Sequence, residues 1–282
     1  MNLNIAKDKN KTENLSLIDT HCHIHESDFP LDQRETLLAS AAANVQTIFC
    51  VGTNMQSSRE TIDFAKNFDD KFGVKIFSII GVHPHESKDF SEDNLKEMQK
   101  MIQENREQIK GIGEIGLDYF YEFSSREKQK NALKMQIQLA CENNLPISFH
   151  VRDDRKNSGE VWRDFWKFLD DFNDNFRGVL HSYTEQNRDN LRKAISRGFY
   201  FGVNGISTFA KGNEKNLWRE IPLNKILFET DAPFLAPIPF RGKTNQPSFV
   251  PKIVESLADL RNEKYEEIAK NANKNSAELF KI

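Results

Sequence analysis

The stretch IDTHCHIH, residues 18–25, decides how the fold of the whole chain is interpreted. In a strand, successive side chains alternate between faces, so His21 and His23 point the same way. Two imidazoles one pleat repeat apart can both reach one cation at zinc–nitrogen distances of about 2.0–2.1 Å. Two buried, hydrogen-bonded histidines explain an isolated H-x-H pattern equally well. The choice therefore depends on whether other strands supply partners at equivalent places.

Apolar runs and amphipathic segments alternate along the chain outward from this stretch. Continuous apolar runs predict strands covered on both faces, and S-x-x-E patterns at Ser57 and Ser124 predict helix starts. Eight strand candidates, most followed by a helix, favour a single parallel (β/α)8 TIM-type barrel, with a doubly wound open sheet as the alternative. The predicted strands cover residues 17–23, 45–51, 75–82, 109–117, 145–151, 178–183, 199–203 and 226–231. The predicted helices cover residues 32–43, 57–68, 91–108, 124–141, 161–172, a segment ending at Gly198, 250–260 and 265–280.

Length and composition limit the number of domains. By length alone, 282 residues could form two domains, but a single barrel of about 250 residues fits equally well. With 38% hydrophobic residues and 22 Phe, the chain can fill a large core. The net charge of −3 argues against a protein that coats nucleic acid, although one strand end could enter a locally positive cleft. Cys22, Cys50 and Cys141 are scattered and lack a C-x-x-C pattern, which argues against a disulfide framework or a structural zinc knuckle.

The N-terminal segment differs from the rest of the chain. Residues 1–14 are polar and rich in Lys and Asn, without the apolar core of a secretory signal, so we expect a disordered extension. Residues 15–282 are then the barrel domain. No apolar run approaches the length of a membrane span. We expect a cytoplasmic protein that has no membrane contact and no obligate protein partner.

The histidines are all placed at or just beyond the carboxyl ends of predicted strands, and two carboxylates, Glu114 and Asp231, occupy similar places. In a barrel these ends converge on one rim, where active sites are built. Imidazoles and carboxylates together suit one or two divalent metal ions. Taken singly, Glu114 could be an ion-pair or capping residue and Asp231 a helix cap. The seven histidines are His21, His23, His25, His83, His85, His150 and His181.

Several stretches together resemble the TatD-type metal-dependent deoxyribonuclease family, a branch of the amidohydrolase-like barrels. The resemblance implies a barrel hydrolase that cuts DNA, often from a 3′ end, with two Mg²⁺, Mn²⁺ or Zn²⁺ ions. It implies one metal held by His21, His23, Glu114 and Asp231, and another held by Glu114, His150 and His181. The stretches are IDTHCHIH (18–25), GVHPHE (81–86), GEIGLDYF (113–120), PISFHVRD (146–153), GVLHSYT (178–184), ILFETDAPFLAP (226–237), RGKTNQPSFV (241–250) and NANKNSAELF (271–280).

The departures from that family's pattern are small, and none touches a predicted ligand. The sequence has HSY at residues 181–183 where HCF or HSF is more usual, Glu185 where Gly is common and Gln246 where Glu is common. These departures bear on which substrate is preferred and not on metal binding.

The chemistry of phosphodiester hydrolysis fits such a site. The diester is anionic, so the site must add positive charge and ionise water near neutral pH, which metal coordination achieves. We expect Asp231 to accept the proton of the attacking water and Glu114 to bridge the ions. Lys110 lies at the opposite end of its strand and cannot supply a carboxylated lysine bridge. Glu229, two residues before Asp231, is expected to orient a ligand.

Four further side chains are candidate substrate contacts, each with an alternative role. His83 could bind a phosphate oxygen or belong to a rigid turn, and Arg152 could bind phosphate or balance the acidic loop that follows it. Tyr183 could stack a base or line the barrel mouth. Arg241 could clamp phosphate or be a solvated basic turn.

The sequence therefore predicts a metal-dependent phosphodiesterase, a 3′-5′ exonuclease acting on single-stranded or frayed DNA ends, with RNA as a further candidate substrate. A barrel hydrolase acting on a small amide, lactone or phosphotriester is the alternative enzyme. A metal-holding scaffold is the alternative without catalysis. Metal-dependent release of mononucleotides separates these interpretations.

Overall fold

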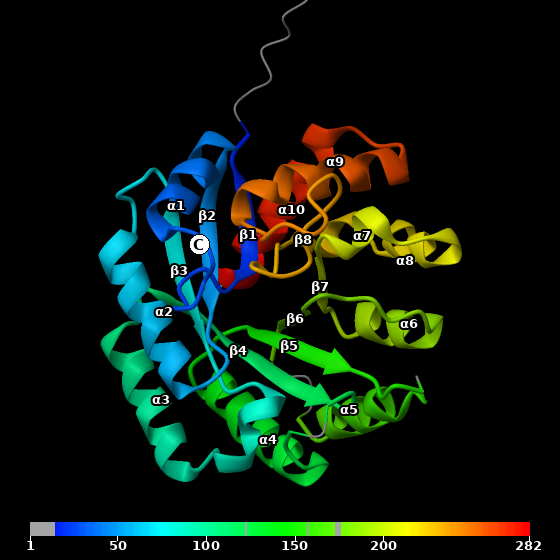
Figure 1. Ribbon diagram of the computed structural model, residues 1–282. Helices are drawn as coiled ribbons and strands as arrows, with labels where there is room; N and C mark the ends of the chain where they lie inside the picture. Colours follow the sequence, from blue (N-terminus) through cyan, green and yellow to red (C-terminus); the bar gives the residue numbers. More distant parts are fainter. Residues whose placement is uncertain (1–14, 122, 157, 173–175) are drawn as a thin grey trace, which may run out of the picture.

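The computed structural model describes residues 15–121, 123–156, 158–172 and 176–282, and the predicted extension at residues 1–14 lies outside them. Eight parallel strands form one sheet in the order β1 to β8, which confirms the (β/α)8 barrel and excludes a doubly wound order (Figure 1). The strands are β1 (Leu17–Cys22), β2 (Val45–Val51), β3 (Lys75–Ile80), β4 (Ile109–Asp118), β5 (Ile147–Arg152), β6 (Gly178–Leu180), β7 (Tyr200–Val203) and β8 (Ile226–Phe228).

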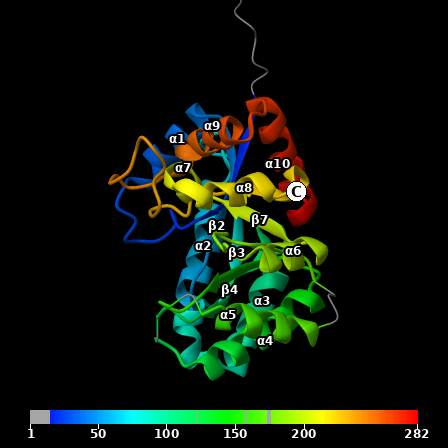
Figure 2. The same ribbon diagram turned by 90° about the vertical axis from the view of Figure 1, so that its right-hand side faces the viewer.

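The helices lie outside the sheet, as the two perpendicular views show (Figures 1 and 2). No helix among the described residues is both long enough and apolar enough to cross a membrane. The helices are α1 (Gln33–Ala42), α2 (Met55–Phe68), α3 (Glu92–Glu104), α4 (Arg126–Glu142), α5 (Glu160–Asp170), α6 (Arg188–Ser196), α7 (Ile206–Phe209), α8 (Asn216–Glu220), α9 (Val250–Arg261) and α10 (Tyr265–Phe280), with short 3-10 turns at Pro84–Asp89, Gly212–Lys215, Leu223–Lys225 and Pro247–Phe249.

The first and last strands meet through side chains and strand-end backbone. The Thr20 hydroxyl donates to the Phe228 carbonyl at 3.0 Å, and the Asp231 amide donates to the His21 carbonyl at 2.9 Å. Farther along, the His23 amide donates to the Ala232 carbonyl at 2.8 Å. The barrel is thereby nearly closed, and the histidine stretch lies beside the end of β8.

One end of the barrel interior is filled by apolar side chains. Phe49 of β2 packs on Phe280 of α10, with ring centroids 4.3 Å apart, and Phe77 packs against Phe49 at 5.3 Å. Val179 and Leu227 are buried in the same cluster. A second, larger apolar layer packs the helices on the outside of the sheet. Because the interior is plugged in this way, access to the barrel is at the carboxyl ends of the strands.

Two predicted helix starts are corrected by the structure. α2 begins at Met55 because the Asn54 side chain caps it by accepting the Ser57 amide at 2.9 Å. α4 is capped by Ser125, whereas the Ser124 hydroxyl donates to the His85 carbonyl at 2.7 Å. In both cases a neighbouring polar residue takes the capping role that the sequence pattern assigned elsewhere.

Gln136 of α4 fixes the end of β3. Its side chain accepts the Val82 amide at 2.8 Å and donates to the Val82 carbonyl at 3.1 Å. Both residues are buried. Gln136→Leu leaves both backbone groups unpaired, so we expect it to lower the free energy of unfolding by about 2–4 kcal/mol. Urea denaturation measures this loss. Gln138→Leu, an exposed position on the same helix, is the control, and equal stability of the two variants would contradict the expectation.

Candidate metal centre

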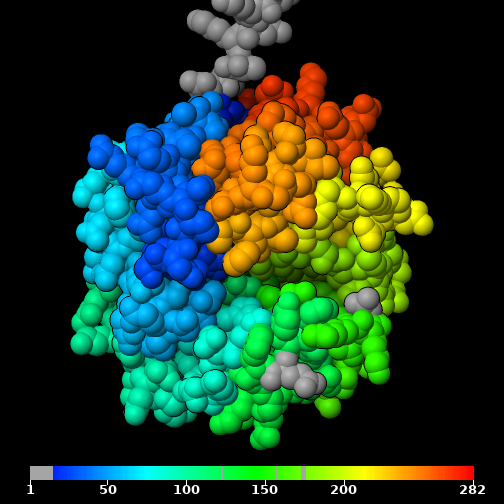
Figure 3. Space-filling model, in the orientation of Figure 1, coloured from blue at the N-terminus to red at the C-terminus, as the bar shows by residue number. Residues whose placement is uncertain are grey.

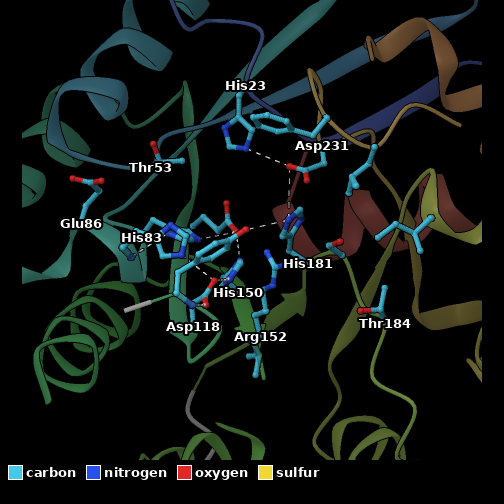
Figure 4. A pocket seen from close by; sticks show the side chains of 18 of the residues that line it. His23, Thr53, His83, Glu86, Asp118, His150, Arg152, His181, Thr184 and Asp231 are labelled. Atoms are coloured by element: carbon cyan, nitrogen blue, oxygen red, sulfur yellow. Dashed lines mark hydrogen bonds and ion pairs between the residues drawn. The ribbon is translucent and has the colours of Figure 1, made fainter. Parts of the chain in front are cut away.

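Five of the six predicted ligands line one pocket at the carboxyl ends of the strands, with a volume of about 740 Å³, and the sixth, His21, is buried beside them (Figure 3). The space-filling view shows this hollow between the blue and orange surfaces above and the green surface below. The close-up shows side chains from both sides of the barrel pointing into it (Figure 4). The pocket is lined, among others, by His23, His83, Glu114, Asp118, His150, Arg152, His181 and Asp231.

His21, His23 and Asp231 form the first group of donors. The Nε2 atoms of His21 and His23 lie 3.9 and 3.4 Å from Asp231 Oδ1. His23 Nδ1 lies 2.8 Å from the Val51 carbonyl, to which it can donate, leaving Nε2 as the lone-pair donor that faces the pocket. Asp231 has φ of 58°, a left-handed conformation that ends the extended chain after β8.

Glu114 of β4 lies at the centre of the other donors. Its Oε2 lies 3.4 Å from His21 Nε2, and its Oε1 lies 3.7 Å from His181 Nε2 and 2.6 Å from His150 Nδ1. His83 Nε2 lies 3.6 Å from the same Oε1 atom. Burial opposes ionisation of this carboxyl group, but the surrounding histidines hold its pKa well below the usual value. Glu114 is therefore an anion shared by four imidazoles.

His150 is held between two carboxylates, one of which the sequence analysis missed. Its Nε2 lies 2.9 Å from Asp118 Oδ2, which also lies 3.0 Å from His85 Nε2. The Asp118 Oδ1 atom accepts the amides of Phe120 and Tyr121, at 2.8 and 3.0 Å. Asp118 thus orients the His150 ring toward Glu114. The sequence does contain a signal for Asp118. It lies four residues after Glu114 in the same strand, and an even spacing places two side chains on the same face of a strand.

His181 forms an ion-pair contact with Glu229, the residue that was expected from the sequence to orient a ligand. Its Nδ1 lies 3.1 Å from Glu229 Oε1, and its ring stacks on that of His21 with centroids 3.6 Å apart. Glu229 also accepts the Ser182 amide at 2.7 Å. The second nitrogen, Nε2, faces Glu114 and lies 3.8 Å from Asp231 Oδ1.

A buried carboxylate beneath the first group was also missed. Asp19 is fully buried and accepts the amide and hydroxyl of Thr230, at 2.9 and 2.5 Å, together with the His21 amide at 3.2 Å. Burial raises the pKa of its carboxyl group to about 7, although the hydrogen bonds from Thr230 and His21 act to lower it. Asp19 ties the backbone that carries His21 to the backbone that carries Asp231.

The donor set fits divalent metal ions. Three overlapping groups each have ligand atoms within 4.8 Å of one another: His21, His23 and Asp231; His21, Glu114 and His181; His83, Glu114 and His150. His21 Nε2 is buried and makes no hydrogen bond although it faces Glu114. An unpaired buried imidazole nitrogen surrounded by carboxylates is what a site for a nitrogen- and oxygen-bound cation requires.

The four predicted substrate contacts fall into two pairs. His83 and Arg152 line the pocket, and His83 is close enough to Glu114 and His150 to be a metal donor as well. Tyr183 is corrected, because it is 3% exposed and packs against Phe201, with ring centroids 4.9 Å apart. Arg241 is outside the pocket lining, and its guanidinium lies over the Phe209 ring at 3.8 Å.

Metal binding is expected to release protons. Burial opposes the charged imidazolium, but nearby carboxylates raise the pKa of His23 and His150 to about 9 and that of His181 to about 10. In protein stripped by a chelator these rings are therefore protonated at pH 7, whereas a metal ligand must be neutral. Metal affinity should rise as the pH increases toward 9.

Calorimetric titration of Mn²⁺ at pH 7, in two buffers of different ionisation enthalpy, measures the number of protons released. We expect about one to three, because three donors carry raised pKa values. A release of zero, with an affinity that does not change between pH 6.5 and 8.5, would contradict this expectation.

Comparison with known proteins agrees with the geometry. Residues 18–281 match the family model described as TatD related DNase. The "Uncharacterized metal-dependent hydrolase YabD" of Bacillus subtilis is 32% identical, over 94% of this chain and 99% of the relative. The "3'-5' ssDNA/RNA exonuclease TatD" of Salmonella typhimurium is 30% identical, over 94% of this chain and 99% of the relative.

A solved structure has the same architecture over nearly the full chain. The TatD homologue YJJV of Escherichia coli superposes with a TM-score of 0.82 at 26% identity, covering 95% of this chain and 99% of that one. A dihydroorotase of Campylobacter jejuni, at 14% identity and a TM-score of 0.61, shares the fold alone. The matched model, the relatives and the barrel agree, and the chain belongs to the TatD family of metal-dependent hydrolases.

Proposed function

We propose that this protein is a 3′-5′ exonuclease that hydrolyses single-stranded or frayed DNA ends with two divalent ions, Mg²⁺, Mn²⁺ or Zn²⁺. The observation that carries the proposal is the shared carboxylate Glu114, whose Oε2 atom lies 3.4 Å from His21 and whose Oε1 atom lies 3.7 Å from His181 and 2.6 Å from His150. One carboxylate between two groups of imidazoles suits a pair of ions. Relatives named as ssDNA/RNA exonucleases support the substrate class.

The pocket suits a terminal nucleotide. Its volume of about 740 Å³ lies within the range of about 300–1,000 Å³ found for small-molecule sites. Bound ions would supply positive charge to the phosphodiester and lower the pKa of water. We assign one ion to His21, His23, Glu114 and Asp231, and the other to Glu114, His150 and His181.

The chain's own residues perform the remaining tasks. Asp231 is ionised at neutral pH, because His181 and His23 lower the pKa of its carboxyl against the effect of burial. Its side chain is 16% exposed toward the pocket, so it can accept the proton of an attacking water. Arg152 lines the same pocket and can donate to phosphate oxygens.

The test is digestion of a single strand labelled at its 5′ end by protein supplied in turn with each of the three ions. We expect progressive shortening from the 3′ end with release of mononucleotides, and complete loss of activity in excess chelator. Parallel assays with an RNA strand, a lactone and a cyclic amide define the substrate class. Turnover of the lactone or amide, with every oligonucleotide left intact, would overturn the proposal.

A further inference from the structure

A second groove adjoins the metal centre on the side of β4 and β5. It has a volume of about 740 Å³ and is lined by Phe120, Tyr121, Phe123, Arg155 and Lys156, among others. We refer to these five residues as the aromatic groove. Tyr121 also lines the metal-centre pocket, so the two hollows share a wall. A chain that enters the pocket can therefore continue into the groove.

Arg152 connects the two hollows. It lines the metal-centre pocket, and its guanidinium lies 4.1 Å from the ring centroid of Phe120 and 5.0 Å from that of Tyr121. The guanidinium of Arg155, in the loop that follows β5, lies 5.1 Å from the ring centroid of Phe120. Cation–π contacts of this kind hold the guanidinium groups beside the aromatic rings. Positive charge is thereby placed along the whole path from the pocket to the groove.

Of the aromatic rings of the groove, Phe123 is exposed, whereas Phe120 and Tyr121 are half-buried. Phe123 is 63% exposed, the highest value among the large hydrophobic side chains that the structure describes. Its ring is stacked on Tyr121, with centroids 5.4 Å apart and planes inclined by 16°. His85 supports both rings edge-on, at 5.3 Å from Tyr121 and 5.0 Å from Phe123. A fixed, exposed aromatic surface is what an unpaired base stacks on.

The charge of the groove suits a polyanion. Arg155 and Lys156 are both exposed. Asp154 is the carboxylate in the wall of the groove, and it already accepts the Lys156 amide at 2.8 Å and the Ser158 hydroxyl at 2.8 Å. Its negative charge is engaged by its own loop. The cations are therefore available to phosphates, although the whole chain has a net charge of −3.

We propose that the aromatic groove binds the nucleotides of a single strand that lie 5′ of the terminal nucleotide in the metal centre. This inference rests on the proposed function, whose substrate it extends from one nucleotide to a length of strand. Bases stack on the exposed ring of Phe123, which Tyr121 supports, without regard to sequence, and Arg152, Arg155 and Lys156 contact the backbone. Affinity should consequently rise with strand length and fall with salt.

The test is fluorescence anisotropy of metal-loaded protein with a labelled 20-nucleotide strand whose last three 3′ linkages are phosphorothioates. A gel run after the titration checks that the strand is intact. We expect the wild type to bind this strand at least tenfold more tightly than a dinucleotide of the same chemistry. The double variant Phe123→Ala/Arg155→Glu should lose at least tenfold in affinity for the long strand and most of its length preference.

The matched control is Leu38→Ala/Lys100→Glu, which removes one exposed apolar side chain and reverses one charge on α1 and α3. Thermal melting checks that both variants are folded. Equal affinity of the groove variant and the control for the long strand would overturn the proposed role of the groove. A wild type that binds the long strand no more tightly than the dinucleotide would do the same. Tight, length-dependent binding without any cleavage of an unmodified strand would instead overturn the nuclease activity and leave the groove supported.

Discussion

Glu114→Ala should lower kcat on single-stranded DNA by about a thousandfold or more and reduce the metal content from two ions to one or none. Glu114 is the carboxylate that lies within 3.7 Å of His21, His150 and His181. Without it, the imidazoles of the two donor groups face one another with no anion between them. The loss of both charge neutralisation and metal retention accounts for the size of the effect. Metal analysis of the purified variant and a digestion time course measure it.

Glu86→Ala is the control for this variant. Glu86 is an exposed carboxylate that lines the same pocket but belongs to none of the three donor groups. We expect wild-type metal content for it. If the Glu114 variant keeps two tightly held ions and full activity, Glu114 does not bridge the ions.

Asp231→Asn should lower kcat by about 10²–10⁴, the usual contribution of general base catalysis, while the fold stays intact. The substitution preserves shape but removes the negative charge that lies 3.4 Å from His23 Nε2. An amide cannot accept the proton of the attacking water. Because Asp231 belongs to only one donor group, the groups centred on Glu114 should still hold metal.

Three measurements separate catalysis from stability for this variant: kcat on an oligonucleotide, metal content and the urea midpoint. Asp28→Asn, an exposed carboxylate in the loop after β1, serves as the control. Activity within a few-fold of the wild type would show that another group takes the proton.

Much of the fold could be predicted because its signals are local. The run at β2 (Val45–Val51) and the helix α10 (Tyr265–Phe280) have the predicted bounds, since an uninterrupted apolar run and a periodic apolar face depend on neighbouring residues only. The convergence of the histidines followed from one topological fact, that parallel barrel strands end at the same rim. That fact placed His150 and His181 beside His21 without any contact being known.

The rest depended on contacts that no local pattern contains. Asp19 acquires its role from Thr230, 211 positions later in the chain. Tyr183 was assigned to the rim on the assumption that β6 continues, but the strand ends at Leu180 and Ser182 has φ of 48°. That turn breaks the alternation of side chains and places the Tyr183 ring in the core. A cytoplasmic location and the absence of an obligate protein partner stay predictions.

The meeting of the first strand with the last has a consequence for how the site is made in the cell. During translation the chain already carries His21, His23, Glu114, His150 and His181 when Asp231 is still 50 codons from the ribosome's active site. At about 5–20 residues per second this interval lasts about 3–10 s. Thr230, which donates to Asp19, and Asp231, the proposed general base, are therefore synthesised together and after all the other predicted ligands. If the proposed function holds, the site is complete only after β8 has been synthesised and has joined β1.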